Sequence, residues 1–270
     1  MEDRFWHKAY AKDVPPTINY ETMTLPQALE RTALKYPETI ALVMMGKTIT
    51  YRRLNELVNR FSGALAELGL QKGDKVAIVL PNMPQVIIAA YAVFKLGGVV
   101  VMNNPLYTET ELAHQLNDSD SKMAIIMDLL VPRFLNLKEK TGIETIISCH
   151  IRDYLPFPKK QLFPFVKKKM HRKHDPAEGV LEFMDLIKRY PPDPPKTEVL
   201  FEDLAALLYT GGTTGVSKGV VLTHANCSIC VQQLKAWLPD AEDGKDSMLG
   251  TFPVFHTAGF TTGMNTAIYR

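Results

Sequence analysis

Strand-like and helix-like patterns alternate between residues 75 and 148, and this alternation constrains the fold more than any other feature. Apolar runs of strand length predict β-strands at residues 75–80, 99–102, 122–127 and 143–148. Helices are predicted between them, at residues 84–96, 108–116 and 130–140. Because parallel strands need crossover connections of this kind, the pattern predicts an α/β fold with a mostly parallel sheet and helices on both faces.

The flanking segments extend this pattern. Residues 40–51 predict a β-hairpin, and an amphipathic helix over 51–68 follows, capped by Thr50 and ended by Gly69. Thr108 and Glu111 have the spacing of a capping box at the start of the helix over 108–116. Further along, the patterns predict a short helix at residues 181–189 and a proline-rich linker at 191–195. Two strands are predicted after it, at residues 203–209 and 220–223.

Composition narrows the class of protein. The chain has 270 residues, of which 46% are hydrophobic, and this is enough for one large or two smaller globular domains. A formal net charge of +2 gives no indication of a nucleic-acid-binding protein. Three cysteines are typical of a reduced, cytoplasmic chain without disulfides, and no apolar leader follows Met1.

Residues 151–175 concentrate positive charge. This segment has eight lysines and arginines against two aspartates, a net charge of +6, with phenylalanines interleaved. Aromatic and basic side chains together are typical of a peripheral contact with an anionic bilayer, which would place the protein at the inner membrane face. The alternative interpretation is a solvated loop with a few buried aromatic side chains.

A glycine-rich loop carries the strongest functional signal. Residues 209–219 read YTGGTTGVSKG, with four glycines, three threonines and Lys218. Glycines allow backbone N–H groups to converge on one point, while hydroxyls and an ammonium add donors, a combination suited to a polyphosphate. The loop is not a Walker A motif, because Ser217 and Gly219 stand where that motif requires Gly and Ser or Thr. A strand, not a helix, is predicted after it.

The string YTGGTTGVSKGVVLTH, residues 209–224, resembles the AMP-binding signature of the adenylate-forming superfamily, most closely in bacterial long-chain fatty acid–CoA ligases. Gly211 and Ser217 depart from the common Ser and Pro. Residues 73–82, 97–108 and 251–259 resemble three further family motifs, in family order. The resemblance implies stacked α/β subdomains: about 25–150, a basic and proline-rich connector at 151–196, and a nucleotide-loop region at 197–270 that starts a second sheet.

The resemblance also implies a reaction. A fatty acid, ATP with Mg²⁺, and coenzyme A would be the partners, and acyl-adenylate the intermediate. The implied phosphate-binding residues are Thr210, Gly211, Gly212, Thr213, Thr214, Gly215, Val216, Ser217, Lys218 and Gly219. Lys218 would act in catalysis, and Thr210 would contact Mg²⁺. His256, in the motif TFPVFHTAG, would lie beside the acyl pocket and the adenylate carbonyl. It would not act as a general base, because a carboxylate nucleophile is already ionised near pH 7.

Other interpretations stay open from the sequence. A medium-chain or aryl acid–CoA ligase would carry the same loop, and a non-catalytic nucleotide- or membrane-binding module is the rival of another class. Cys227 and Cys230 have thioredoxin-like spacing, but they form one helical stripe with Leu234, Trp237 and Leu238, which favours core packing. The family's nucleoside-binding elements and C-terminal domain would follow residue 270, so we expect residues 1–270 alone to be inactive. Acyl chain length and oligomeric state stay undetermined at this point.

Overall fold

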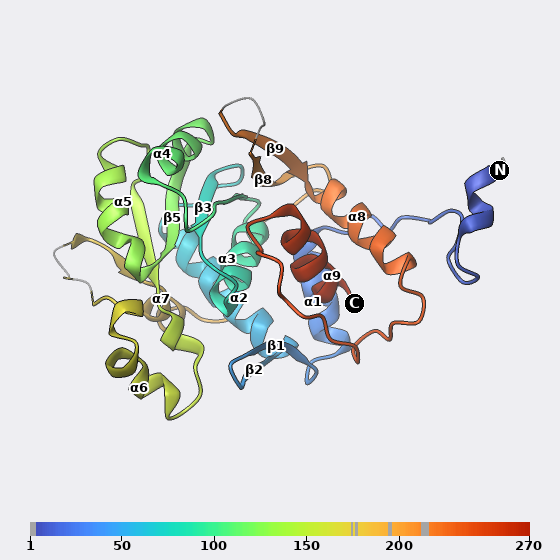
Figure 1. Ribbon diagram of the computed structural model, residues 1–270, viewed down its shortest axis with the longest axis horizontal. Coiled ribbons are helices and arrows are strands. Elements are labelled where there is room, and N and C mark those ends of the chain that lie inside the picture. Colours follow the sequence, from blue (N-terminus) through green and yellow to red (C-terminus); the bar gives the residue numbers. More distant parts are fainter. Residues whose placement is uncertain (1–3, 174, 176–177, 194–195, 212–215) are drawn as a thin grey trace.

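A seven-stranded sheet forms the centre of the computed structural model, which describes residues 4–173, 175, 178–193, 196–211 and 216–270 (Figure 1). Its strand order is β7-β6-β5-β3-β4-β8-β9, and every neighbouring pair is parallel except β8 and β9. The strands are β3 (Lys75–Val79), β4 (Val99–Met102), β5 (Ser121–Met127), β6 (Thr145–Cys149), β7 (Leu181–Glu182), β8 (Leu204–Thr210) and β9 (Lys218–Thr223). The predicted α/β class with a mostly parallel sheet is confirmed.

Helices cover both faces of this sheet, because alternate strand residues point to opposite sides. Val76 and Ile78 of β3 join the larger apolar core, which also contains side chains of α1 (Leu25–Lys35), α2 (Tyr51–Glu67), α3 (Pro84–Lys95), α7 (Phe183–Arg189), α8 (His224–Ala236) and α9 (Thr266–Tyr269). Ala77 and Val79 face a second core built with α4 (Glu109–Asp118) and α5 (Val131–Lys138). Two separate cores on one sheet explain why β3 is apolar on both faces.

Local signals in the N-terminal third act as predicted. The hairpin consists of β1 (Ile40–Met44) and β2 (Lys47–Thr50), joined by Met45 and Gly46 at φ 51° and 94°. The Thr50 hydroxyl accepts from Arg53 N at 3.2 Å and caps α2. At α4 the capping box is complete, since Thr108 N donates to Glu111 Oε2 at 2.7 Å and Glu111 N to Thr108 Oγ1 at 3.3 Å.

The strands beside the glycine loop differ from expectation. We expected residues 197–270 to start a second sheet, but β8 pairs in parallel with β4 and β9 adds to β8, so both strands extend the first sheet (Figure 1). The physical reason is that β4 is buried on both faces and needs a partner on its outer side. The domain limits at 25–150, 151–196 and 197–270 stay a prediction.

The basic segment is more ordered than its composition indicates. It contains α6 (Lys159–Val166) and a 3₁₀ turn at Lys168–Met170, and the sequence patterns predicted neither. The helix predicted at 181–189 is correct from Phe183 onward, but Leu181 and Glu182 pair with β6 as strand β7. Within the described part of the chain, no helix is long and apolar enough to cross a membrane.

The cysteine stripe on α8 is a prediction that the structure corrects. Cys227 is buried, but Cys230, Trp237 and Leu238 are exposed. The buried face of α8 is centred instead on Ser228 and Val231, because the helix packs against α1 and α9 along that side. The three free cysteines form no disulfide.

Candidate functional site

The glycine loop closes an antiparallel hairpin at the edge of the sheet. β8 and β9 pair so that Thr210 is opposite Lys218 and Tyr209 is opposite Gly219. The base of the loop is therefore fixed by strand pairing, as the sequence predicted for a strand–loop–strand unit. Four of the predicted phosphate-binding residues lie outside the described residues: Gly212, Thr213, Thr214 and Gly215.

The hairpin lies at the edge of the sheet where ligands bind in parallel α/β folds. Since β3, β4 and β8 are parallel neighbours, their carboxyl ends meet at one edge. Thr210 is the last residue of β8, Asn103 directly follows β4, and Asn82 follows β3 by three residues. Polar side chains from three strands thus gather at this edge.

Helix α4 anchors the end of the loop that leads into β9. His114 Nε2 donates to the Ser217 carbonyl at 3.0 Å, and Gln115 Nε2 donates to Ser217 Oγ at 3.2 Å. Gln115 Oε1 in turn accepts from the buried amide of Asn103 at 2.6 Å. We did not select these three anchoring residues from the sequence. The available signal was Gln115 itself, a polar residue on the same buried helical face as Leu112 and Leu116.

Tyr209 anchors the end of β8, where the loop begins. Its hydroxyl donates to Asp118 Oδ2 at 2.6 Å and lies 3.3 Å from the Gln115 carbonyl. Burial and the neighbouring carboxylate of Asp118 raise the pKa of Tyr209 well above its usual value, so the phenol stays a donor at neutral pH. A Cβ at Gly219 would lie 3.2 Å from Tyr209 Cζ, so glycine lets the ring pack against β9.

Lys218 is the charged group that this hairpin presents. Its side chain is exposed and forms no ion pair with the described residues. The Thr210 hydroxyl donates to the Lys218 carbonyl at 3.5 Å, so its oxygen lone pairs stay accessible. A Cβ at Gly211 would meet nothing within 4 Å, so the backbone there is open to a close ligand. A free ammonium, a hydroxyl and open backbone suit a phosphate chain.

His256 lies on a segment that Asn82 holds. Asn82 Nδ2 donates to the carbonyls of Gly250 and Phe252 at 3.0 and 2.8 Å, and Asn82 Oδ1 accepts from Val254 N at 2.8 Å. The His256 side chain is exposed at the start of the C-terminal helical turn, where its carbonyl accepts from Phe260 N at 2.8 Å. The structure shows no contact between its ring and the described loop residues, so the two predicted catalytic residues are not joined directly.

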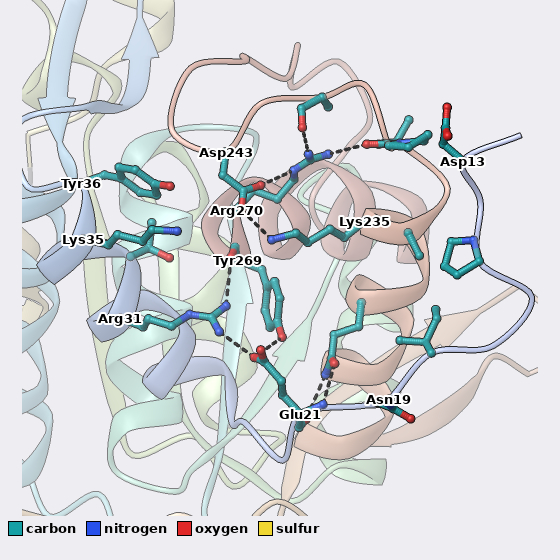
Figure 2. A pocket seen from close by; sticks show the side chains of 18 residues that line it. Asp13, Asn19, Glu21, Arg31, Lys35, Tyr36, Lys235, Asp243, Tyr269 and Arg270 are labelled. Carbon is teal, nitrogen blue, oxygen red and sulfur yellow. Dashed lines mark hydrogen bonds and ion pairs between the residues drawn. The ribbon is translucent and has the colours of Figure 1, made fainter.

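A cavity of about 630 Å³ lies elsewhere, between α1, α8 and the end of the chain (Figure 2). Three of the four cations that line it are paired with its own acids: Arg31 with Glu21 at 2.6 Å, and both Lys235 and Arg270 with Asp243, at 2.6 and 3.0 Å; the fourth is Lys35. None of the described loop residues lines it. Because most of the positive charge in this cavity is neutralised by these ion pairs, it is a poorer fit for ATP phosphates than the loop.

Comparison with known protein families gives the family whose signature the glycine loop resembles. The family model described as AMP-binding enzyme matches residues 29–270. The chain belongs to this family. The match begins within α1 and covers all seven strands of the sheet, so the family assignment rests on the whole fold.

Individual relatives are similar over nearly the full chain. A long-chain-fatty-acid–CoA ligase of Bacillus subtilis is 38% identical over 97% of this chain and 48% of its own length. A ligase of the same name from Salmonella typhimurium is 36% identical over 98% and 48%. The crystal structure of such a ligase from Archaeoglobus fulgidus superposes with a TM-score of 0.77 at 25% identity, over 96% of this chain and 48% of that one. The chain thus spans about half the length of the curated relatives it matches.

Proposed function

We propose that the protein containing this chain is an AMP-forming acid–thiol ligase that activates a long-chain fatty acid with ATP and transfers the acyl group to coenzyme A. The observation that carries the proposal is the β8–β9 hairpin, which presents the exposed side chains of Thr210 and Lys218 at the carboxyl edge of a parallel sheet, with Lys218 in no ion pair among the described residues. Support also comes from relatives named long-chain-fatty-acid–CoA ligase. A structurally similar anthranilate–CoA ligase, with a TM-score of 0.73, was solved with anthranoyl-AMP.

The chemistry assigned to the loop is electrostatic. The substrate carboxylate attacks the α-phosphorus of ATP, the bond to the β-phosphate oxygen breaks, and pyrophosphate leaves with the developing negative charge. Lys218 and the loop amides donate to that charge, and the hydroxyls of Thr210, Thr213 and Thr214 orient the phosphates. Because Ser217 and Tyr209 are anchored to α4, Lys218 and Thr210 beside them are positioned before the reaction.

Mg²⁺ fits the same edge. The Thr210 hydroxyl is a hard oxygen ligand with accessible lone pairs, of the type that magnesium prefers beside phosphate oxygens. The ion supplies charge neutralisation on the phosphates when bound. We assign Thr210 as its ligand from this chain, and His256 as a contact to the acyl-adenylate on the segment that Asn82 holds.

The test is ATP–pyrophosphate exchange by the intact protein, with palmitate, octanoate and benzoate as alternative acids. Exchange that depends on palmitate supports the proposal, and preference for octanoate or benzoate identifies a medium-chain or aryl acid ligase instead. A protein that binds ATP but exchanges no pyrophosphate with any acid is a nucleotide-binding module, which contradicts the proposal.

Peripheral membrane contact at the cytoplasmic face is the second part of the proposal. Phe157, Phe165 and Val166 are 82%, 73% and 70% exposed, around α6. Lys159–Lys160 and Lys167–Lys169 lie on the same short segment and are exposed. Apolar side chains that insert and lysines that contact anionic headgroups form the combination that binds a bilayer surface.

Binding to phosphatidylglycerol vesicles tests this contact. Replacing Lys167–Lys169 by glutamine weakens cosedimentation at low salt, because exposed charges act within a Debye length of about 10 Å at 0.1 M salt. The matched control replaces Lys138, Lys188 and Lys245, which removes the same charge elsewhere. Equal loss in both variants, or no loss in either, argues that the segment is a solvated loop.

A further inference from the structure

A second polar cluster lies at the same edge of the sheet, on the other side of β3 from the glycine loop. Asp128 directly follows β5, His150 directly follows β6, and Glu182 ends β7. These three strands are parallel neighbours, so their ends converge. His171 comes from the basic segment and completes the cluster.

The donor atoms of this cluster are close together. His150 Nδ1 lies 2.9 Å from Asp128 Oδ2, and His171 Nδ1 lies 3.3 Å from the same oxygen. The three atoms all lie within 4.8 Å of one another. Four ligands at about 2.0 Å from a tetrahedral zinc ion are separated by about 3.3 Å, so one pair already matches and the others need shifts of roughly 1.5 Å or less.

Because the cluster is buried, its carboxylate needs a compensating positive charge. Asp128 is fully buried, and His150 is 6% exposed. An ionised carboxylate in such a place requires hydrogen bonds and a counter-charge. Arg172 N and Leu129 N donate to Asp128 at 2.8 and 3.0 Å, which supplies dipoles but no net charge.

The second carboxylate orients the histidine. His150 Nε2 lies 2.9 Å from Glu182 Oε2, so Glu182 can accept an N–H from the ring in the tautomer that leaves Nδ1 free to bind a metal. In that tautomer the Nδ1 lone pair faces the Asp128 carboxylate, which is stable only with a cation between them. A carboxylate that holds the distal nitrogen of a histidine is the usual outer partner of a metal-ligating imidazole.

We propose that Asp128, His150 and His171 bind a zinc ion, with Glu182 orienting His150. Water completes a tetrahedral site of three protein ligands. The ion joins the carboxyl ends of β5 and β6 to His171, the residue after the 3₁₀ turn Lys168–Met170. Its effect is to fasten the basic segment to the sheet.

The competing occupant is a proton on His150. Burial alone would lower the pKa of His150, but its hydrogen bonds to Asp128 and Glu182 raise it to about 9. A protonated His150 bridging two carboxylates would hold the cluster without metal. The two occupants differ in one measurable respect, since only the first binds zinc with defined stoichiometry.

The experiment is titration of the purified, metal-free chain with Zn²⁺ at pH 7.5, by calorimetry, and with Co²⁺, by visible absorption. We expect one equivalent with micromolar or tighter affinity and a tetrahedral Co²⁺ spectrum. His171→Gln removes a ligand that is less buried than Asp128 and should weaken binding by at least about 100-fold, while Glu182→Gln should weaken it about 10–100-fold. Cys230→Ser is the control, because Cys230 is the exposed cysteine and a competing zinc ligand.

A second readout covers variants that fold poorly. Saturating Zn²⁺ should slow tryptic cleavage after Lys167–Lys169 in the unchanged chain, because His171 is held, and should leave cleavage elsewhere unaffected. Absence of one-to-one binding below about 100 µM overturns the proposal. So does binding that survives His171→Gln or is lost in Cys230→Ser, and in those cases the cluster is a proton-bridged ion group.

Discussion

Replacing Gln115 by leucine should destabilise the chain through its buried partner Asn103 and through Ser217 in the glycine loop. Gln115 Oε1 accepts from the Asn103 amide at 2.6 Å, and Asn103 is fully buried. Leucine has similar size but no acceptor, so the Asn103 N–H loses its partner at a cost of about 1–3 kcal/mol. Loss of the bond to Ser217 Oγ adds about 0.5–1.5 kcal/mol. Together the free energy of unfolding should fall by about 1.5–4.5 kcal/mol.

Urea denaturation followed by circular dichroism measures this change. Ser217→Ala is the matched control, because it removes only the Ser217 bond and should cost less than Gln115→Leu. Adding Asn103→Leu to Gln115→Leu should recover part of the loss, since both buried polar groups are then absent together. A cost for Gln115→Leu no larger than that of Ser217→Ala would refute the account of α4 as the anchor of the loop.

Three further outcomes are expected. Lys218→Ala in the intact protein should slow adenylation, through a loss of about 2–4 kcal/mol of transition-state stabilisation, and should leave folding unchanged. The adenylation rate is measured as single-turnover pyrophosphate release. Rates within twofold of the parent reject Lys218 as a phosphate ligand. Burial lowers the pKa of His224 from 6.5 to about 4, so its neutral form contributes stability above pH 6.5 that is lost as pH falls toward 4. Between pH 7.5 and 5 this loss should be about 2 kcal/mol, and His224→Gln should remove it in urea titrations at both pH values. Gly219→Ala should disturb Tyr209, whose ring lies 3.2 Å from the new Cβ, and shift near-ultraviolet circular dichroism, whereas Gly211→Ala should not.

The fold was predictable where local patterns decide it. Capping at Thr50 and Thr108 depends on side chains three residues apart, and each hydrogen bond occurs as predicted. The alternation of strands and helices likewise predicted a mostly parallel sheet, because crossover connections leave little choice. Such local patterns could not predict the order of the strands. Nothing local to residues 204–223 indicates that β8 would pair with β4, about one hundred residues earlier.

The candidate site was predictable only in part, for a related reason. The loop residues are contiguous and carry their own chemistry, so the sequence indicated them directly. Their anchors, His114 and Gln115, act through contacts that span about one hundred residues. The stripe on α8 was wrong because apolar spacing identifies a face but not which neighbours bury it, and here Cys230 is exposed.

The strand order also explains why α4 can hold the loop. The chain passes from β3 to β4, and then through α4 to β5 on the opposite side of β3. α4 therefore crosses the point where the sheet changes direction, which is where parallel α/β folds place ligands. Addition of β8 to the free edge of β4 brings Ser217 against α4. One crossover helix thus links the glycine loop to the centre of the sheet, so a change at Gln115 should affect stability and loop position together.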